Sequence, residues 1–228
     1  MSLSIIIPCY NEKLTIESIL TRVRNCQPDA ELIVVDDAST DGSKEWLQNH
    51  TTIFNFHLIC HSKNQGKGAA LQSAFPLATQ DIIIIQDADL EYDPHHYPQL
   101  IKPIQDNRCD VVYGSRFLTK QIPSSSYLLA YLANKFLTQL TNLVTPLQLT
   151  DMETCYKVFR REIIQSLHLK ETGFGIEPEI TVKLAKQSYQ ILDIAITYNP
   201  RRYHDGKKIG IADFFWAIWC IFRYRFLN

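Results

Sequence analysis

The stretch Asp81-Ile82-Ile83-Ile84-Ile85-Gln86-Asp87-Ala88-Asp89-Leu90-Glu91 decides the fold class of this chain. Its first part is a continuous apolar run of strand length, which fits a strand buried on both faces, as strands of parallel sheets are. An acidic loop follows at once, and Pro94 then stands at the start of a helical pattern that runs to residue 105. A buried strand, an acidic loop and a helix in this order predict an α/β protein.

The same alternation extends outward along the chain. Apolar, β-rich runs predict strands at residues 4–8, 31–35, 56–60 and 110–113, and helical spacing predicts helices at 15–23, 43–48 and 68–77. Beyond them the pattern predicts helices at 124–143, 178–186 and 211–226, a strand at 155–159 and an extended segment at 191–198. Units of this length indicate right-handed crossovers in a mostly parallel central sheet flanked by helices. Because no repeat or linker interrupts residues 1–228, we expect a single domain.

Polar residues follow the predicted strands at the points where these strands end. They are Asn11-Glu12, Asp36-Asp37, Asp87-Ala88-Asp89 and Gly114-Ser115-Arg116. In parallel sheets, ligands bind outside the carboxyl ends of the strands. We therefore expect these groups to gather at one edge of the sheet.

The acidic loop has the composition of a site for a hard divalent cation. Asp87 and Asp89 provide carboxylates one residue apart, and Glu91 adds a third oxygen ligand. Mg²⁺ or Mn²⁺ there would hold a diphosphate and stabilise the charge on a departing nucleoside diphosphate. The alternative is a structural one, in which the acids cap the turn and the helix that follow.

Three other strand-end residues have a functional and a structural interpretation each. Asp37 either accepts hydrogen bonds from a base or ribose or caps the next helix. Lys67, in Asn64-Gln65-Gly66-Lys67-Gly68 at a helix start, either contacts phosphate or base or is a solvated lysine. Arg116 can pair with phosphate.

A basic loop near the C-terminus contains the remaining candidates. Arg201, Arg202, Lys207 and Lys208 surround Gly206, and such a loop could close over a donor and exclude water. The alternative is an ordinary exposed basic loop.

Composition excludes several classes of protein. The net charge of −1 provides no basic field, so no nucleic-acid partner is expected. The 6 cysteines form neither a CxxC pair nor a zinc-spaced cluster, which predicts reduced thiols in a cytoplasmic protein. The sequence has no signal-peptide pattern and no apolar run long enough to span a bilayer.

The predicted C-terminal helix has a wide apolar face. Its members recur at helical spacing: Ile211, Phe214, Phe215, Ile218, Trp219, Phe222 and Phe226. Aromatic residues near Arg223 and Arg225 are typical of a helix lying on a membrane surface. Packing on the sheet, or on a second subunit in a homodimer, is the alternative.

The ordered set of motifs resembles family 2 glycosyltransferases of the GT-A fold. The set comprises Ile5-Ile6-Ile7-Pro8-Cys9-Tyr10-Asn11-Glu12, Val34-Val35-Asp36-Asp37, the segments 64–68 and 87–91 quoted above, Gly114-Ser115-Arg116, Asp151-Met152-Glu153-Thr154-Cys155-Tyr156-Lys157 and Gly206-Lys207-Lys208. Within the family it is most similar to the branch of dolichol-phosphate mannosyltransferase and polyprenyl-phosphate sugar synthases. The resemblance covers nearly the whole chain.

The resemblance implies inverting transfer of a sugar from a UDP- or GDP-sugar to a polyprenyl phosphate or another cell-envelope glycan precursor. It divides the chain into a donor-binding half (1–115), an acceptor-side half (116–210) and a C-terminal helix (211–228). The residues it assigns to the donor are Pro8, Tyr10, Glu12, Val35, Asp37, Lys67, Asp87, Ala88, Arg202 and Lys208. Asp87, Asp89 and Glu91 would hold the metal, and Arg116 would contact a donor or acceptor phosphate.

The catalytic base is left open by the same resemblance. Asp151, Glu177 and Glu179 are the candidates, with loop anchoring or helix capping as the alternative. A phosphate acceptor is already ionised at neutral pH and needs no base. Residues 123–130 lack the arginine that lipid-phosphate transferases tend to carry there.

Other functions fit the sequence less well. Nucleotidyltransferases that make sugar nucleotides usually have a glycine-rich loop with Arg and Lys after the first strand, whereas this chain has Pro8-Cys9-Tyr10-Asn11-Glu12. A dehydrogenase would have GxGxxG at that place. A non-catalytic nucleotide-sugar-binding protein is disfavoured by the presence of Glu12, Asp87 and Asp89.

Overall fold

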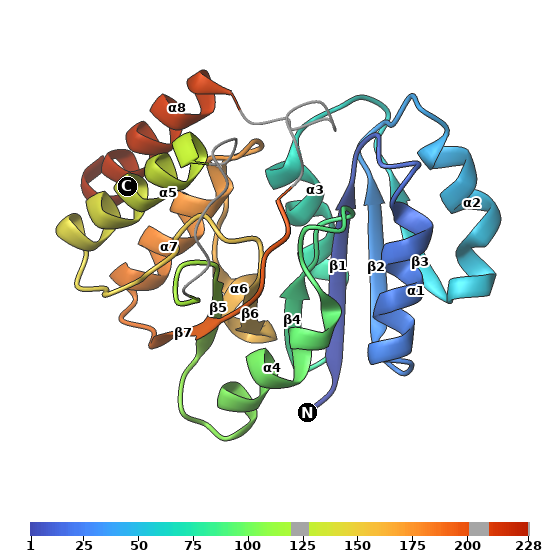
Figure 1. Cartoon of the computed structure of the whole chain (residues 1–228), viewed down its shortest axis with the longest axis horizontal. Helices are drawn as coiled ribbons and strands as arrows, with labels where there is room; N and C mark the ends of the chain where they lie inside the picture. The colour runs from blue at the N-terminus through green and yellow to red at the C-terminus, as the bar shows by residue number, and fades with distance from the viewer. Residues whose placement is uncertain (120–127, 201–209, 228) are drawn as a thin grey trace.

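A computed structural model describes residues 1–119, 128–200 and 210–227 (Figure 1). The strands are β1 (Leu3–Cys9), β2 (Glu31–Asp36), β3 (Phe56–Cys60), β4 (Ile82–Ile85), β5 (Val111–Ser115), β6 (Lys157–Arg160) and β7 (Ile191–Ala195). The α-helices are α1 (Ile16–Cys26), α2 (Ser43–Phe54), α3 (Lys67–Ala74), α4 (Tyr97–Gln105), α5 (Leu128–Val144), α6 (Arg161–Ser166), α7 (Ile176–Lys186) and α8 (Ile211–Phe222). Short helical turns are η1 (Phe75–Leu77), η2 (Pro94–His96) and η4 (Arg223–Leu227), the last with π geometry.

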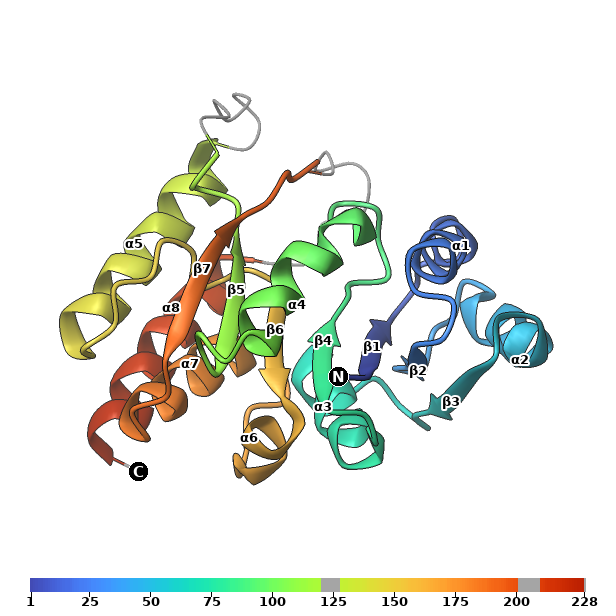
Figure 2. The same cartoon turned by 90° about the horizontal axis from the view of Figure 1, so that it is seen from below.

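The strands form one 7-stranded sheet in the order β3-β2-β1-β4-β6-β5-β7. Strands β3, β2, β1 and β4 pair in parallel, and β7 pairs in parallel with β5. Strand β6 is antiparallel to both of its neighbours, β4 and β5. Helices α1 and α4 cover one face of the sheet, and α3, α6 and α7 cover the other (Figure 2).

The central strands are apolar because both of their faces are covered. All four residues of β4 are fully buried, as are Ile5, Ile6 and Ile7 of β1. Helix α1 buries one stripe, formed by Ile16, Ile19, Leu20 and Val23, whereas α7 is buried on nearly all sides. Continuous apolar strands and amphipathic helices are thus two consequences of the same layered packing.

The predicted mostly parallel sheet flanked by helices is confirmed, with shifts at the ends of elements. Strand β6 begins at Lys157 rather than at residue 155, and regular β7 ends at Ala195, beyond which Tyr198 forms an isolated bridge with Tyr92. Helix α6 was absent from the predicted order because its six residues are too short for a helical period to show. The predicted helix at 124–143 is described from Leu128, and its first residues lie outside the described part of the chain.

Helix α8 is buried through a different face from the large apolar face that the sequence predicts. Its buried residues are Ala217, Cys220 and Ile221, followed by Tyr224 in η4. Most of the large predicted face points outward, with Phe215 64% and Phe226 64% exposed. The predicted α-helix to residue 226 also stops at Phe222, where the π turn begins. Ala217 and Cys220 allow a close approach of the helix, and Ile221 and Tyr224 add buried bulk on the same side, whereas Phe215, Trp219 and Phe226 remain exposed.

The six cysteines form no disulfide within the described residues, and four of them are buried. Within the described residues, no helix has the length and apolar character required to cross a bilayer.

Candidate active site

The loops after β1 and β2 are joined by side-chain hydrogen bonds. Asn11 Oδ1 accepts a hydrogen bond from Thr40 N at 2.7 Å, and Asn11 N donates to Ser39 Oγ at 2.9 Å. Glu12 N donates to Ser43 Oγ at 2.9 Å, at the start of α2. These bonds bring the first two strand-end motifs together, as the ligand-binding rule for parallel sheets predicts.

Asp37 organises the loop that precedes α3. Its carboxylate accepts hydrogen bonds from Gln65 N at 2.9 Å and Gly66 N at 2.7 Å, and it contacts His61 Nδ1 at 2.7 Å. Because Asp37 is only 3% exposed, these internal partners occupy most of its hydrogen-bonding capacity. The arrangement favours an anchoring role for Asp37, while its predicted contact with the nucleoside stays a prediction.

The two glycines that flank Lys67 are required by close backbone packing. Gly66 has φ +97°, and a Cβ placed there would lie 2.6 Å from Thr172 O. A Cβ at Gly68 would meet Glu171 O and Thr172 C. Ala69 N donates to Thr172 O at 2.9 Å, so the start of α3 is held against residues 171–173. This contact fixes the place from which Lys67 points.

Lys67 reaches the acidic loop after β4. Its Nζ lies 3.0 Å from Asp87 Oδ1 and 3.2 Å from Glu177 Oε1. Burial alone would lower the pKa of the Lys67 ammonium, but the charge of Asp87, together with Cys155 and Glu177, holds that pKa well above its ordinary value. Lys67 is therefore a permanent cation beside the predicted metal ligands.

Glu177 joins Lys67 to a second, fully buried lysine. Lys157 Nζ forms an ion pair with Glu177 Oε2 and donates to Met152 O at 2.9 Å and to Thr154 O at 2.5 Å. The chain of charges Asp87–Lys67–Glu177–Lys157 thus runs from the acidic loop into the core. The sequence pattern assigns no role to Lys157, although it lies in the quoted motif 151–157 at the start of β6.

Arg116 and Asp151 form a buried bidentate pair. Arg116 Nε and Nη2 donate to the two Asp151 oxygens at 2.7 and 2.8 Å, and Arg116 N donates to Oδ2 at 3.0 Å. Arg116 also lies over the ring of Tyr198, with its Cζ 5.2 Å from the ring centroid. The pair ties the end of β5 to the motif before β6, which favours an anchoring role for Asp151.

Glu179 is likewise engaged with its own surroundings. Its carboxylate accepts hydrogen bonds from Lys170 N at 2.8 Å and Glu171 N at 2.7 Å, and it pairs with Lys183 Nζ at 2.6 Å. Of the ion pairs found in the described part of the chain, the one between Glu177 and Lys67 joins a candidate base to a cation that also contacts the acidic loop.

The carboxylates of the acidic loop fit a divalent cation of the Mg²⁺ or Mn²⁺ type. Asp87 keeps 24% of its side chain exposed, and Asp89 Oδ1 accepts a hydrogen bond from Glu91 N at 3.0 Å. Among the residues the structure describes, no group of three or more acidic, His or Cys side chains has metal-binding geometry. Two carboxylates supplemented by phosphate oxygens are the usual set for Mg²⁺, and the assignment of Asp87 and Asp89 to this role stays a prediction.

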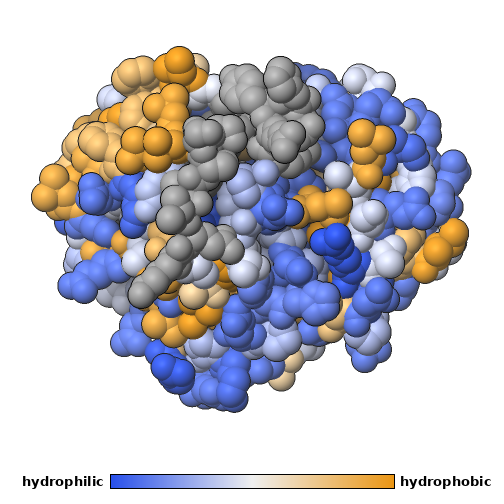
Figure 3. Space-filling model, viewed as in Figure 1, coloured by the Kyte–Doolittle hydropathy of each residue, from blue (hydrophilic) through white to orange (hydrophobic). Residues whose placement is uncertain are grey.

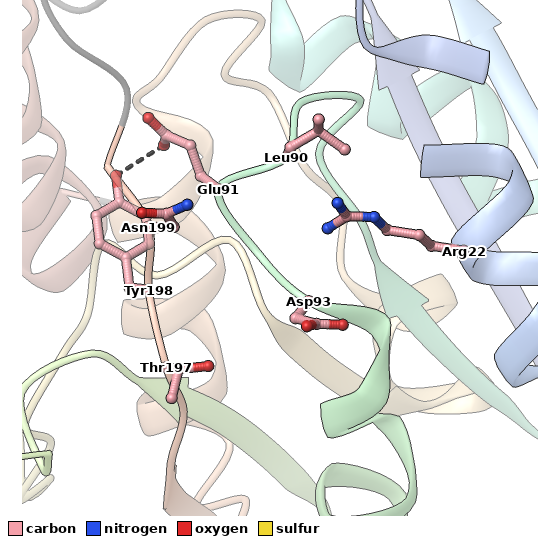
Figure 4. A pocket seen from close by; sticks show the side chains of 7 residues that line it. All are labelled: Arg22, Leu90, Glu91, Asp93, Thr197, Tyr198 and Asn199. Carbon is pink, nitrogen blue, oxygen red and sulfur yellow. Dashed lines mark hydrogen bonds between the residues drawn. The ribbon is translucent and has the colours of Figure 1, made fainter. Parts of the chain in front are cut away.

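Glu91 is hydrogen-bonded to the segment after β7. Its Oε2 accepts a hydrogen bond from Tyr198 OH at 2.7 Å, and both residues border a cavity of about 260 Å³ (Figure 4). The cavity is lined by Arg22, Leu90, Glu91, Asp93, Thr197, Tyr198 and Asn199. This engagement makes Glu91 a positioning group for the segment after β7, while its predicted metal contact stays a prediction.

The other predicted donor residues lie at the same edge of the sheet or outside the described residues. Pro8 pairs in register with Val35 at the ends of β1 and β2, and the Val35 side chain is fully buried. Tyr10 is half-buried, and Ala88 is 3% exposed between the two aspartates. Arg202 and Lys208 lie outside the described residues.

Glu153 is an unexpected titratable group in the same motif as Lys157. Its Oε1 is buried and has no hydrogen-bond partner among the described residues. Burial, followed by the charge of Glu177, raises the pKa of the Glu153 carboxyl from 4.5 to about 7, although Lys157 and Arg116 act in the opposite direction. No feature of the sequence marks this environment, because it is created by residues from three separate segments.

Glu153→Gln is expected to remove a pH dependence of stability. The folded-state pKa is raised, so the stability associated with the neutral carboxyl is complete below pH 4.5 and is lost as the pH rises through about 7. Glutamine is neutral at every pH. At pH 8 the free energy of unfolding of the variant should therefore be about 2–3 kcal/mol higher than that of the parent. Urea unfolding at pH 5 and pH 8 measures this, with exposed Glu162→Gln as the control. An equal effect at both pH values would contradict the prediction.

Comparison with known proteins identifies the family. The model of "Glycosyl transferase family 2" matches residues 4–167, which include every described site residue up to the start of α7. The chain belongs to this family. It is therefore a glycosyltransferase, and the alternatives of a nucleotidyltransferase or a non-catalytic binding protein are set aside.

The curated relatives of this family 2 chain support the predicted branch. It is 26% identical over 216 residues to the undecaprenyl-phosphate mannosyltransferase of Micrococcus luteus, covering 90% of this chain and 86% of that protein. It is 28% identical over 214 residues to the dolichol-phosphate mannosyltransferase of Pyrococcus furiosus, covering 92% of this chain but only 60% of that longer protein.

Solved structures show that this family 2 chain has the GT-A fold. Glucosyl-3-phosphoglycerate synthase of Mycobacterium tuberculosis, in complex with Mn²⁺, UDP and glucosyl-3-phosphoglycerate, aligns with a TM-score of 0.73 at 18% identity, covering 100% of this chain and 81% of that chain. Another structure of the same synthase aligns with a TM-score of 0.75 at 19% identity, covering 100% and 82%.

Proposed function

We propose that this glycosyltransferase moves a sugar, with inversion at the anomeric carbon, from a UDP- or GDP-sugar to the phosphate of a polyprenyl phosphate. The observation that supports the donor part best is the 3.0 Å contact between Lys67 Nζ and Asp87 Oδ1. It sets a permanent cation at the start of α3 beside a carboxylate of the acidic loop. A diphosphate bound with a divalent ion needs both kinds of group at one place.

The proposed reaction is a direct displacement. An oxygen of the acceptor forms a bond to the anomeric carbon while the bond from that carbon to the nucleoside diphosphate breaks, and the diphosphate leaves with the electron pair. Mg²⁺ or Mn²⁺ held by Asp87 and Asp89 would neutralise charge on the departing diphosphate. Lys67 and the dipole at the start of α3 add positive potential on the same side.

The phosphate acceptor is supported by the names of the relatives and by the state of the candidate bases. The proteins of M. luteus and P. furiosus are named for transfer to undecaprenyl phosphate and dolichol phosphate. A phosphate oxygen is ionised at neutral pH and attacks without a base. Asp151 and Glu179 are both held by several internal hydrogen bonds, which agrees with a reaction that does not need them as bases.

Transfer assays with labelled UDP- and GDP-sugars can test the acceptor. We expect product with undecaprenyl phosphate or dolichyl phosphate and none with the corresponding free alcohol. Product formed with the alcohol, or only with 3-phosphoglycerate, would overturn the phospholipid acceptor while leaving the glycosyltransferase assignment intact.

Nucleotide binding is expected to depend on a divalent metal. UDP or GDP should bind at least about tenfold more tightly with Mn²⁺ or Mg²⁺ than with EDTA, because the ion bridges two anionic partners. Calorimetry with both nucleotides measures this. Asp87→Asn should abolish the difference, and Asp106→Asn, at an exposed position on the far end of α4, should preserve it. Equal affinity with and without metal would contradict the proposed metal site.

We also propose that the protein lies peripherally on the cytoplasmic face of a membrane. Exposed apolar side chains of α5 and α8 form one region of the surface, visible at the upper left of Figure 3. These exposed residues are Leu128, Leu129, Leu132, Phe136, Ile211, Phe215, Trp216, Trp219 and Phe222. Within the described α5, α8 and η4, Lys135, Arg223 and Arg225 are basic and Asp213 alone is acidic. Aromatic and aliphatic side chains beside a cationic excess suit an anionic lipid surface.

Sedimentation with anionic vesicles tests the membrane face. The parent protein should co-sediment, and Phe215→Ser with Trp219→Ser should reduce the bound fraction several-fold. Ile53→Ser is a matched control, because Ile53 is 70% exposed on α2, away from α5 and α8. Loss of dimers in the double variant without any vesicle binding by the parent would assign the face to a homodimer instead.

A further inference from the structure

Glu171 lies where the C-terminal helix meets the donor side of the sheet. It is 5% exposed, and its carboxylate accepts hydrogen bonds from Trp216 Nε1 at 2.7 Å, Tyr224 OH at 2.6 Å and Arg223 Nη1 at 3.2 Å. All three donors belong to α8 or to η4, which directly continues it. One buried carboxylate therefore bonds to both α8 and η4.

The backbone of the same residue holds the start of α3. Glu171 O accepts a hydrogen bond from Gln72 Nε2 at 2.9 Å and lies so close to Gly68 that no Cβ would fit there. The next carbonyl, Thr172 O, accepts from Ala69 N at 2.9 Å. These contacts flank Lys67, whose Nζ reaches Asp87.

A third connection runs through α7. Glu171 N donates to Glu179 Oε2 at 2.7 Å, two residues along α7 from Glu177, which contacts Lys67. Gly175, at the start of α7, packs between Glu171 and α8, because a Cβ there would lie 2.8 Å from Cys220 Sγ and 2.9 Å from Glu171 Oε2. Both elements that set the position of Lys67 are thus tied to Glu171.

We propose that Glu171 is a positioning residue. It couples the position of α8 to the position of Lys67, which contacts the donor diphosphate. The side chain of Glu171 binds α8 and η4, and its backbone binds α3, so a shift of α8 reaches α3 and Lys67 through this residue. None of the three side-chain donors to Glu171 is a residue that we place in the donor site. The proposal rests on the assignment of Lys67 to the diphosphate.

Conservative changes on α8 and η4 test the link without touching the donor site. Trp216→Phe and Tyr224→Phe each remove one hydrogen-bond donor to Glu171 and keep an aromatic ring. Each should weaken binding of UDP or GDP in the presence of Mn²⁺ about threefold to tenfold, and Glu171→Gln should do so at least as strongly. Trp219→Phe, on the exposed face of the same helix, should bind as the parent does.

Binding of the corresponding nucleoside separates positioning from general loss of structure. Uridine or guanosine lacks the diphosphate, so its affinity should be the same for the parent, Trp216→Phe and Tyr224→Phe. Unchanged diphosphate affinity in both variants, or an equal loss for nucleoside and diphosphate, would overturn the proposed link. A parent protein that binds no nucleotide at all would instead overturn the proposed function.

Discussion

Replacing Asp89 with alanine is expected to lower turnover by roughly 100-fold or more, since metal stabilisation of a departing diphosphate contributes several kcal/mol to the transition state. Asp89 is 7% exposed, and its Oδ1 accepts the hydrogen bond from Glu91 N. Alanine removes both the carboxylate and this bond. The loss of the bond should cost about 1–3 kcal/mol of stability, so a decrease in turnover must be compared at a temperature where the variant is folded.

Asp89→Asn separates the two effects. Asparagine keeps a carbonyl oxygen for Glu91 N but has no charge for the metal, so its turnover should fall nearly as far while its melting temperature stays close to that of the parent. Turnover is measured with saturating donor and Mn²⁺, and Asp106→Asn is the surface control. Turnover within threefold of the parent in Asp89→Asn would remove Asp89 from the catalytic metal site.

Replacing Lys157 with methionine is expected to destabilise the protein by about 3–5 kcal/mol, because it leaves a buried charge without its partner. Lys157 is fully buried and supplies hydrogen bonds to Met152 O and Thr154 O as well as the ion pair to Glu177. Its ammonium also lies 4.7 Å from the ring centroid of Tyr113. Methionine has a similar volume, so the expected loss comes from charge and hydrogen bonding rather than from a cavity.

Urea unfolding of Lys157→Met and of the double variant with Glu177→Gln measures this contribution. The double variant should recover part of the loss, because the uncompensated carboxylate is then neutral. Lys102→Met is the matched control, since its ion pair with Asp106 is exposed and should contribute no more than about 1 kcal/mol. A loss of less than about 1 kcal/mol in Lys157→Met would show that Glu177 is compensated by Lys67 alone.

Much of the fold could be predicted because its signals are local. The four isoleucines of β4 and the apolar stripe of α1 report burial through their own composition and period. The direction of β6 could not be read in this way. An apolar strand has the same pattern whether its neighbours run parallel or antiparallel to it, and the direction depends on the connections before and after it.

The sequence indicates which residues of the candidate site lie at the sheet edge, but it does not indicate which partners they bind. Asp37, Lys67, Asp87 and Arg116 were identified because loops after parallel strands meet at one edge. Their partners come from distant segments, as Glu177 of α7 does for Lys67. Sequence spacing does not report such contacts, and for this reason it assigns no role to Glu153, Lys157 or Glu171.

Sequence by itself determined the α/β class, the order of nearly all elements and the acidic loop after β4. Each of these features depends on the composition and hydrophobic period of a short segment. Only the tertiary structure decided which charges pair, which face of α8 is buried and how Glu171 joins that helix to Lys67. A buried charge is stable only with partners at hydrogen-bonding distance, and those partners are selected by packing in three dimensions rather than by neighbours along the chain.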